Sequence, residues 1–238
     1  MDEIVRRAVQ RAIDTMSEKF GEQLTIDDVA RAAMFSKFHF TRMFQQATGV
    51  TPGRFLSALR LAEAKRLLLS TPNSVADISH QVGYNSVGTF STRFSARVGI
   101  SPTLFRQRGG VAPANQLPGN TGSRAVVRGR LTAQGPVFVG LFPGRIPEGR
   151  PVCHTVLDGP GPYVLPGVPD GSWHLHAYPH DPGAPTRQVA HEGPLTIRSG
   201  PVDRLLDIRL RPVRPFDPPV LLAPPERTTA PAAAGSAA

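Results

Sequence analysis

The sequence contains a single cysteine, Cys153, so no disulfide can form within the chain, and a reducing compartment is expected. Long apolar runs are also missing: nothing approaches the roughly 18 residues of a membrane span, and the N-terminus lacks the apolar segment of a secretory signal. We therefore expect a cytoplasmic protein that does not contact a membrane.

Proline is scarce in one half, since only Pro52, Pro72 and Pro102 of the 25 prolines precede residue 110. Long helices suit the first half and are disfavoured in the second.

Acidic residues are too few to balance the basic ones, which leaves a formal net charge of +9. Residues 1–110 carry 15 Lys and Arg against 9 Asp and Glu, so most of the excess lies in the first half. A basic balance in a small helical domain favours a polyanionic partner such as nucleic acid. Charge alone fits equally well with a soluble basic protein that has no such partner.

Two stretches of the first half are copies of one another. "SKFHFTRMFQQATGVTP" runs over Ser36–Pro52, and "SVGTFSTRFSARVGISP" runs over Ser86–Pro102. Each follows a short segment that opens with a capping-box pattern, "TIDD" at 25–28 and "SVAD" at 74–77. The capping segments are offset by 49 residues and the later helices by 50, so one residue is inserted at the turn of the second copy. The pattern predicts a duplicated helix-turn-helix unit, in which the phenylalanines at helical spacing belong to the core.

Two further helices frame these units. Apolar residues at helical spacing predict one helix over Ile4–Phe20, and a second begins at Pro52 and ends near Ser70. At 1.5 Å per residue the second would be about 27 Å long, enough to hold the two units apart rigidly. Successive major grooves on one face of DNA lie about 34 Å apart, so this separation suits a double contact.

After residue 108 the composition changes. Residues 109–122 are rich in Gly, Pro and Asn and predict a linker. Short β-like runs separated by turn residues then predict a β-sandwich, and these runs lie at 124–133, 136–142, 151–157, 161–168, 172–178, 194–199, 204–210 and 219–223. The predicted organisation is an all-α domain with two helix-turn-helix units and a central helix over 1–108, the linker over 109–122, an all-β sandwich over 123–226 and a disordered tail over 227–238.

These residues resemble a known family. "SKFHFTRMFQQATGVTP", "LRLAEAKRLLL" and "ISHQVGYNSVGTFSTRFSARVGISPTLFR" together are similar to the DNA-binding domain of AraC/XylS-type bacterial transcription regulators. The resemblance covers less than half of the chain. It implies seven helices, with two recognition helices that enter adjacent major grooves of promoter DNA.

The resemblance places DNA contacts on the two recognition helices, at Lys37, Phe38, His39, Thr41 and Arg42 in the first and at Ser86, Val87, Gly88, Ser91, Thr92, Arg93 and Arg97 in the second. Arg42 can donate two hydrogen bonds to guanine, while Thr41 and Phe38 can contact a thymine methyl or a sugar edge. The matching positions of the second helix carry only small side chains, where the family commonly has long polar or basic ones. We therefore expect the second helix to contribute more to the position of the domain on DNA than to the choice of DNA sequence. Arg93, Arg97 and the helix N-terminal amides near Ser86 are the candidates for phosphate contacts.

The domain order departs from the family, because many members place an effector domain before the DNA-binding domain. We therefore expect the partner domain to follow the DNA-binding domain in this chain. Residues 123–223 are loosely similar to carboxypeptidase-regulatory-like or prealbumin-like sandwiches through "VFVGLF" and "YVLPGVPDGSWHLHAY", which supports a fold and no activity. We expect this sandwich, with its aromatic residues Tyr163, Trp173 and Tyr178, to sense a small-molecule effector, to form a homodimer contact or to contact another protein such as RNA polymerase.

Two further patterns carry chemistry. His174 and His176 share one face of a predicted strand, with His180 and Asp181 nearby, which fits either a metal site or two histidines that face water; we favour water. "PVCHTV" around Cys153 is faintly similar to the Pro-Cys-His-Arg element of alkylguanine-DNA alkyltransferases. Neighbouring residues of a strand point to opposite faces, however, so Cys153 and His154 would be separated.

We expect no catalytic site, cofactor or metal. A sequence-specific transcription regulator is thus the main prediction, and a DNA-binding module fused to a Cys153-dependent enzyme, an architectural DNA-binding protein and a ligand-free scaffold remain the alternatives.

Overall fold

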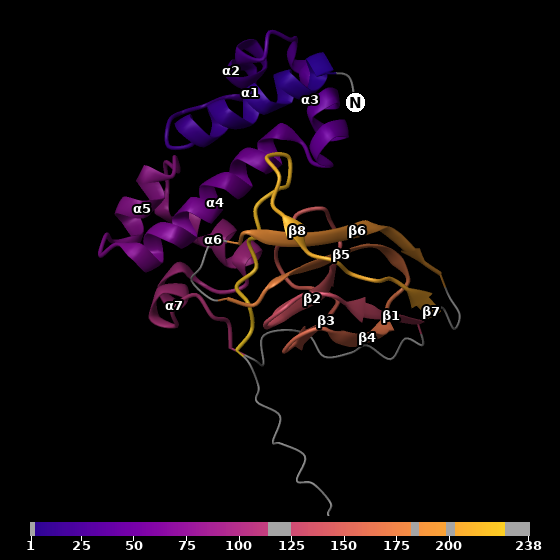
Figure 1. The fold of residues 1–238 in the computed structure, drawn as a ribbon. Coiled ribbons are helices and arrows are strands. Elements are labelled where there is room, and N and C mark those ends of the chain that lie inside the picture. The colour runs from indigo at the N-terminus through magenta and orange to yellow at the C-terminus, as the bar shows by residue number, and fades with distance from the viewer. Residues whose placement is uncertain (1–2, 114–124, 182–185, 199–202, 227–238) are drawn as a thin grey trace, which may run out of the picture.

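A computed structural model describes residues 3–113, 125–181, 186–198 and 203–226 (Figure 1). The helices come first: α1 (Glu3–Lys19), α2 (Ile26–Ala32), α3 (Lys37–Thr48), α4 (Pro52–Ser70), α5 (Val75–Gln81), α6 (Val87–Val98) and α7 (Pro102–Gln107). The strands follow: β1 (Ala125–Leu131), β2 (Val137–Phe142), β3 (Cys153–Leu157), β4 (Gly161–Val168), β5 (Gly171–Pro179), β6 (Gln188–Ile197), β7 (Asp203–Leu205) and β8 (Arg211–Pro212). This order confirms the predicted helical half followed by a β half.

The two helix-turn-helix units are built from the same local signals. Thr25 and Ser74 each cap a short helix through a reciprocal capping box, and Gly49 and Gly99 end the recognition helices α3 and α6 in the left-handed conformation. Pro52 occupies the first turn of α4, as the sequence predicts. The duplicated unit and the helix between its copies are therefore confirmed.

The predicted phenylalanine core is also confirmed. Each copy carries a chain of three packed rings that runs from the recognition helix into the helix after it: Phe40, Phe44 and Phe55 in the first copy, and Phe90, Phe94 and Phe105 in the second. Ring centroids within these chains are 5.4 to 5.6 Å apart, and all six rings are at most 2% exposed. Tilted and edge-to-face pairs at this spacing are favourable aromatic packing.

The β half is a sandwich of two sheets. One has the strand order β4-β1-β7 and the other β3-β2-β5-β6-β8. Alternate residues from both sheets form the core between them, including Val127, Val139, Leu165 and Leu175. The second sheet is covered on its outer face as well, where Phe138, Phe142 and Tyr178 pack with Leu222. This double coverage explains why every residue of β2 is buried.

Three expectations about the second half need correction. Residues 219–223 form no strand; they run between the sheet and the helices without regular secondary structure, with a bend at Leu222, along the yellow part of the ribbon in Figure 1. Strand β6 begins at Gln188, before the predicted 194–199 run, and the 204–210 run contributes only the end of β7 and a bridge from Ile208 to Leu131. Residues 114–122 of the linker and the tail 227–238 lie outside the described residues. Among the described residues no helix is long and apolar enough to cross a membrane.

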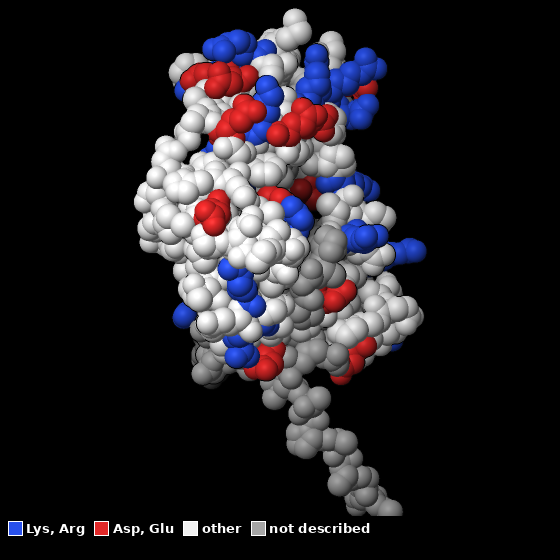
Figure 2. Space-filling view, turned by 90° about the vertical axis from the view of Figure 1, so that its left-hand side faces the viewer, with Lys and Arg blue, Asp and Glu red and all other residues white. Residues whose placement is uncertain are grey.

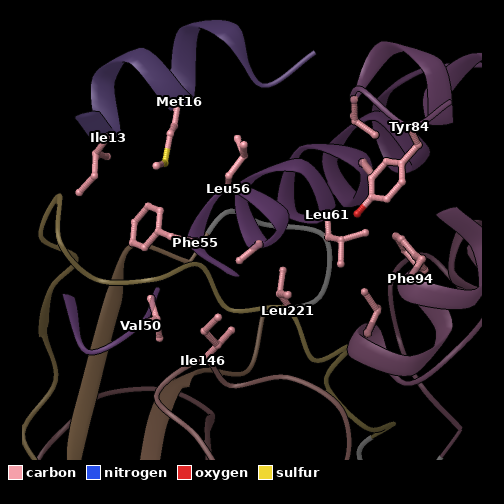
Figure 3. Packing of buried hydrophobic residues seen from close by; sticks show 14 of the residues in the cluster. Ile13, Met16, Val50, Phe55, Leu56, Leu61, Tyr84, Phe94, Ile146 and Leu221 are labelled. Atoms are coloured by element: carbon pink, nitrogen blue, oxygen red, sulfur yellow. The ribbon is translucent and has the colours of Figure 1, made fainter. Parts of the chain in front are cut away.

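The helical half shares its core with segments of the second half. Ile146, Leu221 and Ala223 are almost completely buried in the cluster that also holds Phe55 and Leu61 of α4. Figure 3 shows Ile146 and Leu221 beneath this helix. The start of the expected linker is also bound to the second half, because the backbone N–H of Ala112 donates to Pro224 O at 2.9 Å. The division of the chain at residues 108 and 123 stays a prediction.

The turn after α5 makes a testable prediction about stability. Gly83 has φ +81°, and a Cβ there would lie 2.6 Å from the Phe20 carbonyl oxygen, whereas Gly109 has φ +59° with no atom within 4 Å. Gly109→Ala therefore isolates the cost of a left-handed alanine, about 1 kcal/mol. Gly83→Ala should reduce the free energy of unfolding by at least about 1 kcal/mol more. Urea unfolding of both variants checks this, and equal losses would contradict the close approach.

Candidate nucleic-acid interface

The first turn of α3 presents three of the predicted contact residues at the surface. Lys37, Phe38 and His39 are all exposed, and Phe38 is the most exposed large apolar residue of the described chain at 88%. The Lys37 ammonium is held by the Asp27 carboxylate at 2.8 Å, and the His39 ring stacks on Phe35 with centroids 5.3 Å apart. An aromatic ring held out in water on a helix with a packed opposite face suits contact with another molecule.

The second turn of α3 presents Thr41 and Arg42 beside them. Thr41 is half-buried and Arg42 is exposed. Within the described parts of the chain, the Arg42 guanidinium has no carboxylate or hydrogen-bond partner, unlike Arg54, Arg60 and Arg66 on the next helix. Arg42 therefore keeps all of its donors available for a ligand.

Helix α6 presents a different surface. The Ser86 hydroxyl caps it by accepting from the N–H of Thr89 at 3.3 Å. The next candidates, Val87, Gly88, Ser91 and Thr92, are exposed or half-buried and have short side chains. Arg93 is exposed, and its guanidinium lies 6.0 Å from the ring centroid of Tyr84. The structure therefore places these residues on the helix surface as predicted, with Arg93 as their one long basic side chain.

Arg97 is occupied within the chain. Its guanidinium donates to both carboxylate oxygens of Glu148 at 2.6 and 2.7 Å, and its backbone carbonyl accepts from the N–H of Gly149. Glu148 also accepts from Arg54 at 2.8 Å, so one carboxylate from the second half joins α4 to α6. This carboxylate is only 15% exposed. The phosphate role of Arg97 is untested, and in this arrangement its donors are directed at Glu148.

The second half also contacts the ends of both recognition helices. A Cβ added to Gly49, after α3, would lie 3.0 Å from Cγ of Arg145, and one added to Gly99, after α6, would lie 3.5 Å from Cδ1 of Leu222. We call this set of contacts, made by Arg145, Glu148 and Leu222, the clamp. Sequence analysis missed it, because its partners lie about 50 to 120 residues apart and no local pattern connects them.

Charge is mixed over the far end of the helical half. Figure 2 shows acidic and basic side chains interspersed over the end formed by the first three helices. Pairs such as Arg6 with Glu3 and Arg31 with Asp28 account for part of this mixture. On the face that Figure 2 shows, the basic side chains at this end of the molecule therefore lie among acidic ones.

The histidine and cysteine patterns have other roles. Leu175 and Ala177 of β5 belong to the core of the sandwich. His176, which we expected to face water, is 4% exposed, and its Nε2 lies 3.2 Å from Gly144 O. His174 Nδ1 lies 2.8 Å from His191 Nε2 on β6, and the described residues include no group of three or more ligands able to hold a metal. Burial raises the pKa of the Cys153 thiol to about 11, which disfavours the thiolate that a nucleophile requires.

Comparison with known proteins finds relatives and solved structures that each match less than half of this chain. Residues 29–108 match the family described as a helix-turn-helix domain. The chain is 31% identical over 104 residues to the lactose operon transcription activator of Staphylococcus xylosus, which covers 44% of this chain and 37% of that protein. It is 34% identical over 84 residues to the HTH-type transcriptional activator AarP of Providencia stuartii, covering 35% of this chain and 62% of that protein. The chain thus spans less than two thirds of these relatives.

Among solved structures, the DNA-binding domain of AdpA in complex with a target DNA is 27% identical and has a TM-score of 0.41. The match covers 42% of this chain and 90% of that chain. An AraC-type regulator from Chromobacterium violaceum is 28% identical with a TM-score of 0.42, over 43% of this chain and 92% of that one.

The half-buried histidines His174 and His191 predict that stability falls in acid. Burial, with Arg145 nearby, lowers the pKa of His191 to about 3, and the pKa of His174 is lowered for the same reasons. These imidazoles are neutral in the folded chain and take up protons on unfolding below pH 6.5, so stability falls as the pH falls from about 6.5 towards 3. The loss is at most about 1.4 kcal/mol per pH unit for each histidine.

Urea unfolding at pH 7, 6 and 5 checks this prediction. Other charges around the cluster are Arg211 and Asp217, and Asp217 titrates below this window because its pKa is lowered. His191→Gln should reduce the pH dependence, while His80→Gln, at an exposed histidine on α5, should leave it unchanged. A pH dependence identical in all three proteins would count against the cluster as its source.

Proposed function

We propose that this chain is a sequence-specific DNA-binding transcription regulator of the AraC type, because residues 29–108 match a helix-turn-helix domain family. Its two helix-turn-helix units read promoter DNA in two successive major grooves. The curated relatives support this function, since both are named as transcription activators. The observation that carries the proposal is the surface of α3, where Phe38 and Arg42 project from a helix whose other face is packed core.

The two recognition helices contribute unequally. Arg42 has the reach and the free donors for a bidentate contact with guanine O6 and N7, and Phe38 can lie against a thymine methyl or a sugar. The short residues of α6 offer methyl contacts or single hydrogen bonds, and Arg93 reaches a phosphate. Sequence preference therefore comes mainly from α3, and α6 adds affinity and register.

The second half holds the two readers in one relative orientation. Glu148 ties α6 to the start of α4, while Arg145 and Leu222 lie against the ends of α3 and α6. Contact with two grooves at once requires a defined distance and angle between the recognition helices. The clamp supplies this restraint, and a ligand bound near it can change DNA affinity by tightening or loosening it. Dimer formation and contact with RNA polymerase stay predictions.

Substitutions on the two recognition helices test the reading mode. Arg42→Ala should remove about 1 to 3 kcal/mol of discrimination at one or two positions of one half-site. Arg93→Ala should weaken all sites to a similar degree and reduce the slope of log affinity against log salt by about 1. Selection from a randomised DNA library, with the parent and both variants, measures the two effects. Greater information in the half-site read by α6 would contradict the unequal reading, and an absence of preference in the parent would favour an architectural DNA-binding protein.

Substitution of Glu148 tests the clamp. Glu148→Gln leaves Arg54 and Arg97 without their carboxylate, and the free energy of unfolding should fall by about 1 to 3 kcal/mol. The matched control is Glu226→Gln, which removes an ion pair to Arg108. The distance of this pair, 2.8 Å, equals that between Arg54 and Glu148, but the Glu226 carboxylate is 59% exposed. The control should cost less than about 1 kcal/mol. DNA affinity should fall with Glu148→Gln only; a gain in affinity would indicate that Arg97 is released to bind phosphate and that the clamp does not assist reading.

A further inference from the structure

A cleft of about 760 Å³ lies between the helical half and the second half of the chain. Its walls come from α1, α4 and α7 on one side and from the end of β5 and residues 213–224 on the other. The volume is in the range of pockets that bind small molecules. A molecule in this cleft would contact both halves at once.

The lining of the cleft is largely apolar. Aromatic and aliphatic side chains from three helices and the C-terminal segment contribute, and they include Phe20, Phe55, Leu59, Leu69, Phe105 and Val220. Such a surface favours a ligand with an aromatic or aliphatic body, because the body leaves water on binding. Polar ligands such as sugars would lose their hydrogen bonds to water without replacement over most of this lining.

Two polar groups in the lining have donors to spare. The Tyr178 side chain is 3% exposed, and its hydroxyl is buried without a hydrogen-bond partner among the described residues. Lys65 donates to the carbonyl oxygens of Val220 at 3.2 Å and Leu221 at 3.0 Å, which leaves one of its three N–H donors unused. A buried donor without an acceptor costs about 1 to 3 kcal/mol, so an acceptor supplied by a ligand is favourable here.

The charge of the lining indicates the kind of acceptor. Two of the four carboxylates that line the cleft are neutralised within the chain, Glu63 by Arg66 and Asp217 by Arg211. The other two are Asp14, which accepts from Gln10, and Asp181, and neither has an ion pair among the described residues. Among the described residues Lys65 donates to two carbonyl oxygens and lies 5.8 Å from the ring centroid of Phe105, with no carboxylate as a partner, and burial lowers its pKa to about 8. A carboxylate in the cleft would give this ammonium the counter-ion that the chain does not provide.

We propose that the cleft binds a small aromatic or aliphatic monocarboxylate, with its apolar body between α1, α4 and α7 and its carboxylate on the Lys65 ammonium and the Tyr178 hydroxyl. The C-terminal segment that forms the other wall also supplies Leu222 to the clamp, so the ligand stabilises the packing of the two halves against each other. Binding at this site does not depend on DNA, and it stands or falls separately from the proposed DNA recognition.

The test uses the full chain and two carboxylates, phenylacetate and octanoate, each compared with its uncharged amide. The dye 8-anilinonaphthalene-1-sulfonate serves as a reporter, because it combines an aromatic body with one anionic group. The dye should gain fluorescence on binding, the carboxylates should displace it and raise the unfolding temperature, and the amides should bind at least tenfold more weakly. No thermal shift and no displacement by either carboxylate at millimolar concentration would overturn the proposal.

Three variants locate the site. Lys65→Met keeps the aliphatic stem and removes the charge, so carboxylate affinity should fall at least tenfold. Tyr178→Phe removes only a hydroxyl that has no hydrogen-bond partner among the described residues, so the chain should fold as the parent does and bind the carboxylates several-fold more weakly. Lys19→Met, at an exposed lysine on α1, is the matched control and should bind as the parent does. Unchanged affinity in both Lys65→Met and Tyr178→Phe would overturn the site, and if Lys65→Met does not fold, Tyr178→Phe alone decides.

Discussion

The central helix α4 has apolar side chains around most of its circumference, and the whole arrangement depends on covering them. Phe55, Leu56, Leu61 and Leu68 are at most 5% exposed, although they lie on different faces of the helix. A helix that is apolar on all sides is unstable in contact with water, so other parts of the protein must cover it. The two helix-turn-helix units cover its ends, and Ile146 and Leu221 from the second half cover the remaining side.

This requirement links the two halves of the chain more closely than a linker would. The segment 219–223 lies between the outer face of the five-stranded sheet and the helices, and both neighbours bury it: Leu222 packs on Phe138, while Leu221 belongs to the core of the helical half. Its backbone is satisfied by both sides as well, since Ala223 N–H donates to Val98 O and Leu221 N–H donates to Pro147 O. The segment thus replaces solvent on two surfaces that would otherwise be exposed and apolar.

Burial at this junction also explains its unusual polar groups. Lys65, His176 and Tyr178 lie in or beside the contact between the halves, and burial shifts the pKa of each away from its usual value in the direction of the neutral form. Glu148 is tolerated there because two arginines neutralise it. The polar residues of the junction are thus either paired within the chain, as Glu148 is, or left with unused donors, as Lys65 and Tyr178 are.

The sequence by itself determined the elements of the helical half. The capping boxes at Thr25 and Ser74, the glycines after each recognition helix and the repeated phenylalanine spacing are local signals, and local hydrogen bonding and packing period decide them. The exposed faces of α3 and α6 follow from the same period, so the surface positions of Phe38, Arg42 and Arg93 could be predicted. The sandwich followed from its short apolar runs, but the 219–223 run was read as a strand because an extended apolar segment looks the same whether a sheet or a helix covers it. Only the tertiary structure decided that Arg97 pairs with Glu148, that His176 is buried and that Lys65 donates to the carbonyl oxygens of Val220 and Leu221. Each of these depends on residues that the covering of α4 brings together from distant parts of the chain.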